Sequence, residues 1–111
     1  MKTVLVITTE QSHRFLYETG LRKHFAVAFQ PKVEGGLGKV DAVVYDLPDK
    51  CTTIDLRWLQ ETELPVVVLT PEKSFPLPKA SKQCALTYPV TMDKILRALA
   101  KLGVEAEETK G

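Results

Sequence analysis

The chain has no excess of charge of either sign, no long apolar run and no cluster of cysteines. Its 15 Lys and Arg residues balance 14 Asp and Glu residues, which leaves a net charge of +1. Nucleic-acid-binding domains usually have a basic excess, so we expect no direct contact with nucleic acid. No apolar stretch approaches the roughly 20 residues that a transmembrane helix needs, so we expect no membrane partner.

A recognisable secretion signal is missing as well. After Lys2 only residues 4–7 form a continuous apolar run, whereas a signal peptide has an apolar core of roughly 7–15 residues. Cys51 and Cys84 form neither a CxxC pair nor a set of zinc ligands. We therefore expect a cytoplasmic protein in which both cysteines are free thiols.

What the sequence does contain is a series of short, nearly continuous apolar runs. Runs rich in β-branched and aromatic residues indicate strands that are buried on both faces, as in a parallel sheet covered by helices. A chain of 111 residues suits one such domain. The predicted strands are residues 4–7, 26–29, 42–45, 66–69 and, more weakly, 85–88.

The first predicted helix follows the first strand. Thr8 and Gln11 have the spacing of a capping box, in which two side chains satisfy the free N–H groups of a helix start. Leu16, Gly20 and Leu21 recur at helical spacing. We expect these three residues to form the buried stripe of the helix.

Two further helices are predicted. One begins at Thr52 or Thr53 and ends at Leu64, which is followed by Pro65. The other begins after Thr91, and Gly103 is expected just past its end because glycine readily adopts the left-handed conformation there. The inward-facing residues of this last helix are expected to be Ile95, Leu96, Leu99 and Leu102.

Other segments do not support full helices. Residues 30–40 hold three glycines, which leaves room for a shortened helix of a turn or two. Residues 71–83 hold three prolines, each of which removes a backbone donor, so a loop is expected there. Residues 104–111 are polar and are expected to be a tail or linker outside the domain, which then spans residues 1–103.

This element order predicts an α/β fold with a doubly wound, five-stranded parallel sheet. Right-handed crossovers favour the flavodoxin-like strand order 2-1-3-4-5, with a shortened second helix and a missing or reduced fourth helix. In such folds ligands bind at the carboxyl ends of the strands, so the crevice is expected at that edge. The residues expected at this edge are Thr8, Thr9, Glu10, Asp46, Thr70, Tyr88 and Pro89.

With these residues at the strand ends, the chain resembles the receiver domain of bacterial response regulators, which has the CheY-like fold. The resemblance covers residues 1–103. By this resemblance Asp46 matches the phosphoacceptor at the end of the third strand, and Thr70 matches the switch hydroxyl at the end of the fourth. Pro89 matches the proline after the family's lysine, and Glu10 matches the acidic residue that follows the acidic pair.

The chain departs from the family where the chemistry needs charge. Thr8 and Thr9 stand in place of the acidic pair, and Tyr88 stands in place of the lysine. Mg²⁺ prefers carboxylate oxygens, and a phenol carries no charge that could pair with a phosphoryl group. We therefore interpret the chain as an atypical, degenerate receiver with no metal site, no catalytic residue and no cofactor.

Asp46 consequently has two open interpretations, a phosphoacceptor or a strand-end residue that caps the next loop. The other sequence features carry less information. Residues 35–39 are rich in glycine but lack the glycine and hydroxyl positions of a phosphate-binding loop. His13 and His24 have no carboxylate partner in register and are expected to be surface residues of a helix.

The preferred functional hypothesis is a non-enzymatic signalling domain that acts by protein–protein contact, independently of phosphorylation. The resemblance implies two-component signalling and regulation of transcription, with a protein partner or an attached effector domain. A homodimer, or a contact with a partner, centred on residues 71–83 and the last helix is a further expectation. The alternatives are a receiver that accepts phosphoryl at Asp46 and a flavodoxin-like domain that binds a small ligand.

Overall fold

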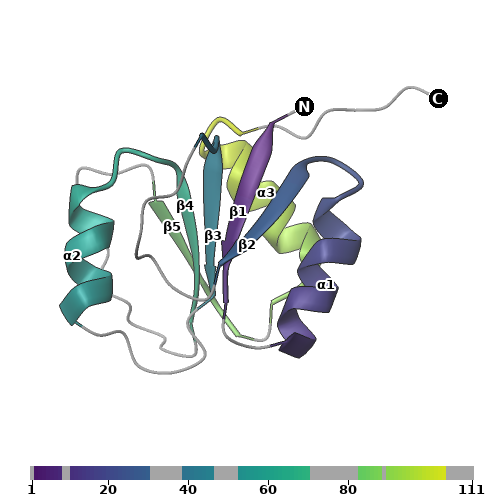
Figure 1. Cartoon of the computed structure of the whole chain (residues 1–111), viewed down its shortest axis with the longest axis horizontal. Coiled ribbons are helices and arrows are strands. Elements are labelled where there is room, and N and C mark those ends of the chain that lie inside the picture. The colour runs from purple at the N-terminus through teal and green to yellow at the C-terminus, as the bar shows by residue number, and fades with distance from the viewer. Residues whose placement is uncertain are drawn as a thin grey trace.

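The computed structural model describes residues 2–8, 11–30, 39–46, 53–70, 83–88 and 90–104. At its centre lies a five-stranded sheet with the order β2-β1-β3-β4-β5, in which every pair of neighbouring strands is parallel (Figure 1). The strands are β1 (Thr3–Ile7), β2 (Ala26–Gln30), β3 (Ala42–Asp46), β4 (Val66–Thr70) and β5 (Gln83–Thr87). The predicted doubly wound α/β fold and its strand order are confirmed.

The three central strands are buried on both faces, which explains their continuous apolar sequences. All five residues of β3 and of β4 are buried, and only Thr3 of β1 is partly exposed. Alternate residues point to opposite faces of a strand. Val4 and Val6 therefore join one core, whereas Leu5 and Ile7 join a second core on the other face.

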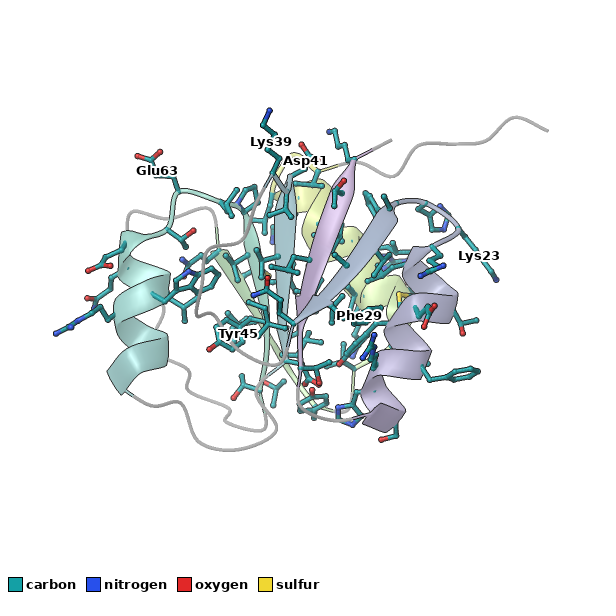
Figure 2. The ribbon with its side chains drawn as sticks, in the orientation of Figure 1. Lys23, Phe29, Lys39, Asp41, Tyr45 and Glu63 are labelled. Carbon is teal, nitrogen blue, oxygen red and sulfur yellow. The ribbon has the colours of Figure 1, made fainter. Side chains whose placement is uncertain are left out.

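Three helices in the described part of the chain cover these two faces. They are α1 (Gln11–Leu21), α2 (Thr53–Glu61) and α3 (Met92–Lys101), and none of them is long and apolar enough to cross a membrane. Helices α1 and α3 cover one face, and α2 covers the other (Figure 1). Figure 2 shows Phe29 on the α1 side and Tyr45 on the α2 side, where the Tyr45 ring lies 5.4 Å from that of Trp58.

Helix α3 has the start and end that its sequence predicts. The Thr91 hydroxyl accepts a hydrogen bond from the Lys94 backbone N–H at 3.3 Å, as an N-cap does. Gly103 has a φ of 89°, the left-handed conformation that a residue with a Cβ atom rarely adopts. Ile95 and Leu99 are buried as expected, because the apolar face of the helix lies on the sheet.

The buried face of helix α1 agrees with the predicted one only in part. Leu21 is buried as expected, but Leu16 is 51% exposed, and Tyr17 is buried in its place. Gly20 does lie at a helix contact, because a Cβ atom at this position would come within 2.5 Å of the Met92 side chain of α3. Residues 15–17 are all apolar or aromatic, so the sequence did not determine which of them faces the sheet.

Several sequence-based expectations concern residues that lie outside the described ranges. These are the shortened helix within 30–40, the loop that replaces the fourth helix within 71–83, the tail beyond residue 104, and Cys51. Cys84 is a free cysteine. Val104 is 4% exposed and its N–H donates to the Leu99 carbonyl at 2.9 Å, so packing continues one residue beyond Gly103.

Candidate functional site

The buried polar residues of the described chain gather at one edge of the sheet. Thr8 directly follows β1, Asp46 ends β3 and Thr70 ends β4, and these are the three buried polar or charged residues that the described part contains. The carboxyl ends of parallel strands meet at the same edge, which is why residues 38 positions apart come together. Burying a polar group is unfavourable unless it forms a hydrogen bond. The hydrogen bonds of these three residues therefore define the chemistry that is available at this edge.

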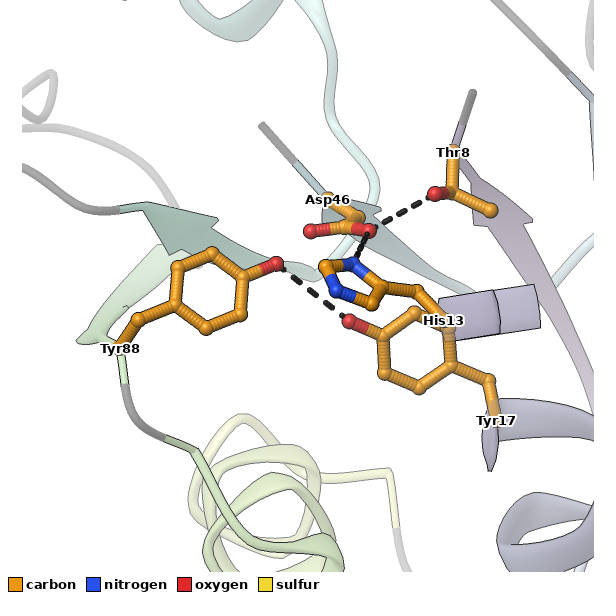
Figure 3. A network of polar contacts seen from close by, with 5 residues as sticks. All are labelled: Thr8, His13, Tyr17, Asp46 and Tyr88. Carbon is orange, nitrogen blue, oxygen red and sulfur yellow. Dashed lines mark hydrogen bonds and ion pairs between the residues drawn. The ribbon is translucent and has the colours of Figure 1, made fainter. Parts of the chain in front are cut away.

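The Asp46 side chain is fully buried, and one of its two oxygens accepts two hydrogen bonds (Figure 3). The Thr8 hydroxyl donates to Asp46 Oδ2 at 2.7 Å, and the Nδ1 atom of His13 lies 2.8 Å from the same oxygen. The other oxygen, Oδ1, is buried and accepts no hydrogen bond from the described residues. The carboxylate is therefore held through one oxygen only.

His13 is one of two residues of this site that the sequence did not predict, and Tyr17 is the other. His13 was expected to be a surface residue without a carboxylate partner, but the first turn of α1 places its ring against Asp46, 33 residues along the chain. Its side chain is 37% exposed, so the imidazole reaches from solvent to the buried carboxylate. His24 has no such contact in the described chain, and its ring packs near that of Phe25.

Two tyrosines line the same site beside His13 (Figure 3). The hydroxyls of Tyr17, from α1, and Tyr88, directly after β5, lie 3.5 Å apart. The imidazole centroid of His13 lies 6.3 Å from the Tyr17 ring and 5.8 Å from the Tyr88 ring. The backbone N–H of Tyr88 donates to the Thr70 carbonyl at 3.0 Å, which fixes Tyr88 at this edge.

The environment of Tyr17 keeps its phenol protonated. Burial raises the pKa of Tyr17 well above its usual value near 10, and the negative charge of the nearby Asp46 carboxylate raises it further. Tyr17 is only 2% exposed. The site therefore holds a neutral hydroxyl donor next to a carboxylate.

This pKa shift makes stability depend on pH in the alkaline range. Up to about pH 10 Tyr17 is protonated in both states, but above it the unfolded chain ionises first, so the free energy of unfolding falls. Above pH 10 we expect the ionisation of Tyr17 in the unfolded chain to lower the free energy of unfolding by about 1.4 kcal/mol per pH unit. The Tyr17→Phe variant is expected to lack this contribution. Urea unfolding from pH 9 to 11 measures it. Equal slopes for the variant and the wild type would contradict the prediction.

The structure brings four of the predicted edge residues together. Thr8, Asp46, Thr70 and Tyr88 lie at the carboxyl ends of β1, β3, β4 and β5, as expected. Thr70 is fully buried and pairs in register with Thr87 of β5. Thr9, Glu10 and Pro89 lie outside the described residues.

The described side chains do not fit the Mg²⁺ ion that a receiver would hold. A hard divalent cation needs several oxygen ligands, of which carboxylates are the strongest. Asp46 is the single carboxylate of the site in the described chain, and its Oδ2 atom already accepts two hydrogen bonds. Across the described ranges no three His, Cys, Asp or Glu side chains form a group that could bind a metal.

Comparison with known proteins identifies the fold. No protein-family model matches the chain, and no curated protein matches it in sequence. The solution structure of a response regulator protein from Burkholderia multivorans is similar, with a TM-score of 0.62 and 20% sequence identity. The similarity covers 97% of this chain and 99% of that protein. The chain therefore has a receiver-like fold along nearly its whole length.

Proposed function

We propose that the chain is a non-enzymatic, receiver-like signalling domain that acts by protein–protein contact and does not depend on phosphoryl transfer to Asp46. The observation that carries this proposal is the set of contacts around Asp46. The carboxylate occupies the phosphoacceptor position of a receiver-like fold, yet it is tied to Thr8 and His13 at 2.7 and 2.8 Å. The residue is held as a structural acceptor of hydrogen bonds.

The missing partner groups support the same proposal. Phosphoryl transfer to a carboxylate relies on cations that neutralise the charge on the moving group. Thr8 stands at the end of β1, where the resemblance would place carboxylates, and offers only a hydroxyl. Tyr88 stands in the lysine position, and its hydroxyl faces that of Tyr17. Neither group supplies the positive charge that the reaction needs.

A contact function also suits the surface of the domain. Phe15 and Leu16 of α1 are 72% and 51% exposed, and they are the large apolar side chains that stand exposed in the described ranges. We propose a cytoplasmic protein partner or an attached effector domain as the receiver of the signal, as in two-component systems and transcription regulation. The contact expected at residues 71–83 and the last helix falls in part outside the described residues, because these include α3 but not residues 71–82.

Incubation with acetyl phosphate and Mg²⁺ tests the proposal against its alternative. We expect no acyl phosphate on Asp46, because Thr8 and Tyr88 stand where the resemblance would place charged groups, and Oδ2 is already hydrogen-bonded. Intact mass before and after hydroxylamine treatment measures it, since hydroxylamine cleaves acyl phosphates. Asp46→Asn is the matched control. A hydroxylamine-sensitive adduct in the wild type that the control lacks would instead establish a phosphoacceptor receiver.

A further inference from the structure

The hydrogen bond between His13 and Asp46 determines which ring nitrogen of His13 is reactive. An ionised carboxylate only accepts hydrogen bonds, so Nδ1 at 2.8 Å from Oδ2 must carry a proton. In the neutral imidazole the lone pair then lies on Nε2. Nε2 has no hydrogen bond with any described residue, and the side chain is 37% exposed. His13 thus presents an oriented imidazole on a partly exposed side chain, with Nε2 as the nitrogen that carries the lone pair.

We propose that His13 is a modification site that accepts a phosphoryl group on Nε2 from a donor with a high-energy P–N or acyl-phosphate bond. This inference goes beyond the contact function proposed above, which requires no modification. The pattern is that of an activated nucleophile, in which a second group orients and polarises the reacting side chain. Asp46 is the positioning residue, and Nε2 is the atom that reacts.

The surroundings of the ring favour a phosphoryl group over other electrophiles. His13 lies in the first turn of α1, an 11-residue helix whose free N–H groups and dipole attract anions, and this turn contains no acidic residue. The hydroxyls of Tyr17 and Tyr88 lie beside the ring and can donate hydrogen bonds to phosphoryl oxygens (Figure 3). The raised pKa of Tyr17 keeps its hydroxyl protonated for this purpose.

Transfer to Nε2 differs from transfer to the Asp46 carboxylate, because Nε2 is a neutral nucleophile and needs no cation to offset a second negative charge. With phosphoramidate as the donor, the Nε2 lone pair forms the new N–P bond, and the P–N bond of the donor breaks. The electron pair of that bond leaves with ammonia. No proton leaves His13, because Nε2 carried none, and the Nδ1 proton stays in its hydrogen bond. The ring becomes positively charged, and the adjacent Asp46 carboxylate stabilises that charge.

The two histidines of the chain make the test specific, because His24 is a partly exposed imidazole without a carboxylate partner in the described chain. The full chain is incubated with phosphoramidate, and the modified residue is mapped by tandem mass spectrometry. We expect an alkali-stable, acid-labile adduct on His13 that forms about 10- to 100-fold faster than any adduct on His24, the rate equivalent of one hydrogen bond to a charged group. His13→Gln should abolish it, and His24→Gln should leave it unchanged.

The Asp46→Asn variant tests whether His13 reacts because Asp46 orients its ring or only because its side chain is exposed. It should slow the modification of His13 about 10- to 100-fold, and ¹⁵N NMR of the imidazole should show loss of the Nδ1-protonated tautomer. Equal rates at His13 and His24 in the wild type, no adduct at all, or an unchanged rate in Asp46→Asn would each overturn the inference. A hydroxylamine-sensitive adduct on Asp46 would contradict the proposed function instead, so the two failures are distinguishable.

Discussion

Replacing Leu99 by alanine is expected to lower the free energy of unfolding by about 2–5 kcal/mol. Leu99 is fully buried in the core between the sheet and helices α1 and α3. The substitution removes apolar contacts and leaves a cavity that the surrounding side chains fill only in part. Urea unfolding followed by circular dichroism measures the change.

Leu16→Ala is the matched control for this experiment. The same atoms are removed from a helix, but Leu16 is 51% exposed, so the change in free energy of unfolding is expected to stay within about 0.5 kcal/mol. If Leu16→Ala destabilised the protein as strongly as Leu99→Ala, the buried face of α1 would be the one that the sequence predicted rather than the one described here.

The second large effect is the coupling between His13 and Asp46. Truncating His13 leaves the fully buried carboxylate with one hydrogen bond from the described residues, that of Thr8. Hydrogen bonds to charged groups contribute about 1.5–3 kcal/mol. In a double-mutant cycle with His13→Ala and Asp46→Asn, we expect a coupling energy in this range of about 1.5–3 kcal/mol, because each single variant already breaks the same contact.

His24→Ala combined with Asp46→Asn provides the control cycle. His24 does not contact Asp46, so its coupling energy is expected to be zero within about 0.5 kcal/mol. A coupling energy for His13 that is equally small would mean that the contact at 2.8 Å does not persist in solution. Both the proposed function and the inference about Nε2 would then lose their main support.

The sheet could be predicted from sequence because strands buried on both faces have uninterrupted apolar sequences. Residues of β3 and β4 are apolar without interruption, and no other common element combines such short runs with so many β-branched residues. The order of the strands followed from the handedness of the crossovers. The residues at the carboxyl edge, among them Asp46 and Thr70, could be placed together for the same reason.

The helical half of the site could not be predicted in the same way. His13 and Tyr17 reach the edge from α1, and their contacts depend on how the helix is rotated about its axis. The sequence offers Phe15, Leu16 and Tyr17 side by side, so apolar periodicity alone leaves that rotation undetermined. One usable signal was the position of His13 five residues after Thr8. This spacing places His13 in the first turn of the helix, next to the carboxyl edge of the sheet.

The strand order has a consequence for the chain as it leaves the ribosome. Strand β1 lies between β2 and β3, and β4 and β5 then follow outward on the β3 side. Each newly synthesised strand can therefore join an open edge, and none has to be inserted between two strands that are already paired. Helix α3 emerges after all five strands and contributes Ile95, Ala98 and Leu99 to one core. Until α3 docks, the apolar face of the sheet that it covers is only partly buried. Exposed apolar surface of this kind makes a folding intermediate prone to aggregation.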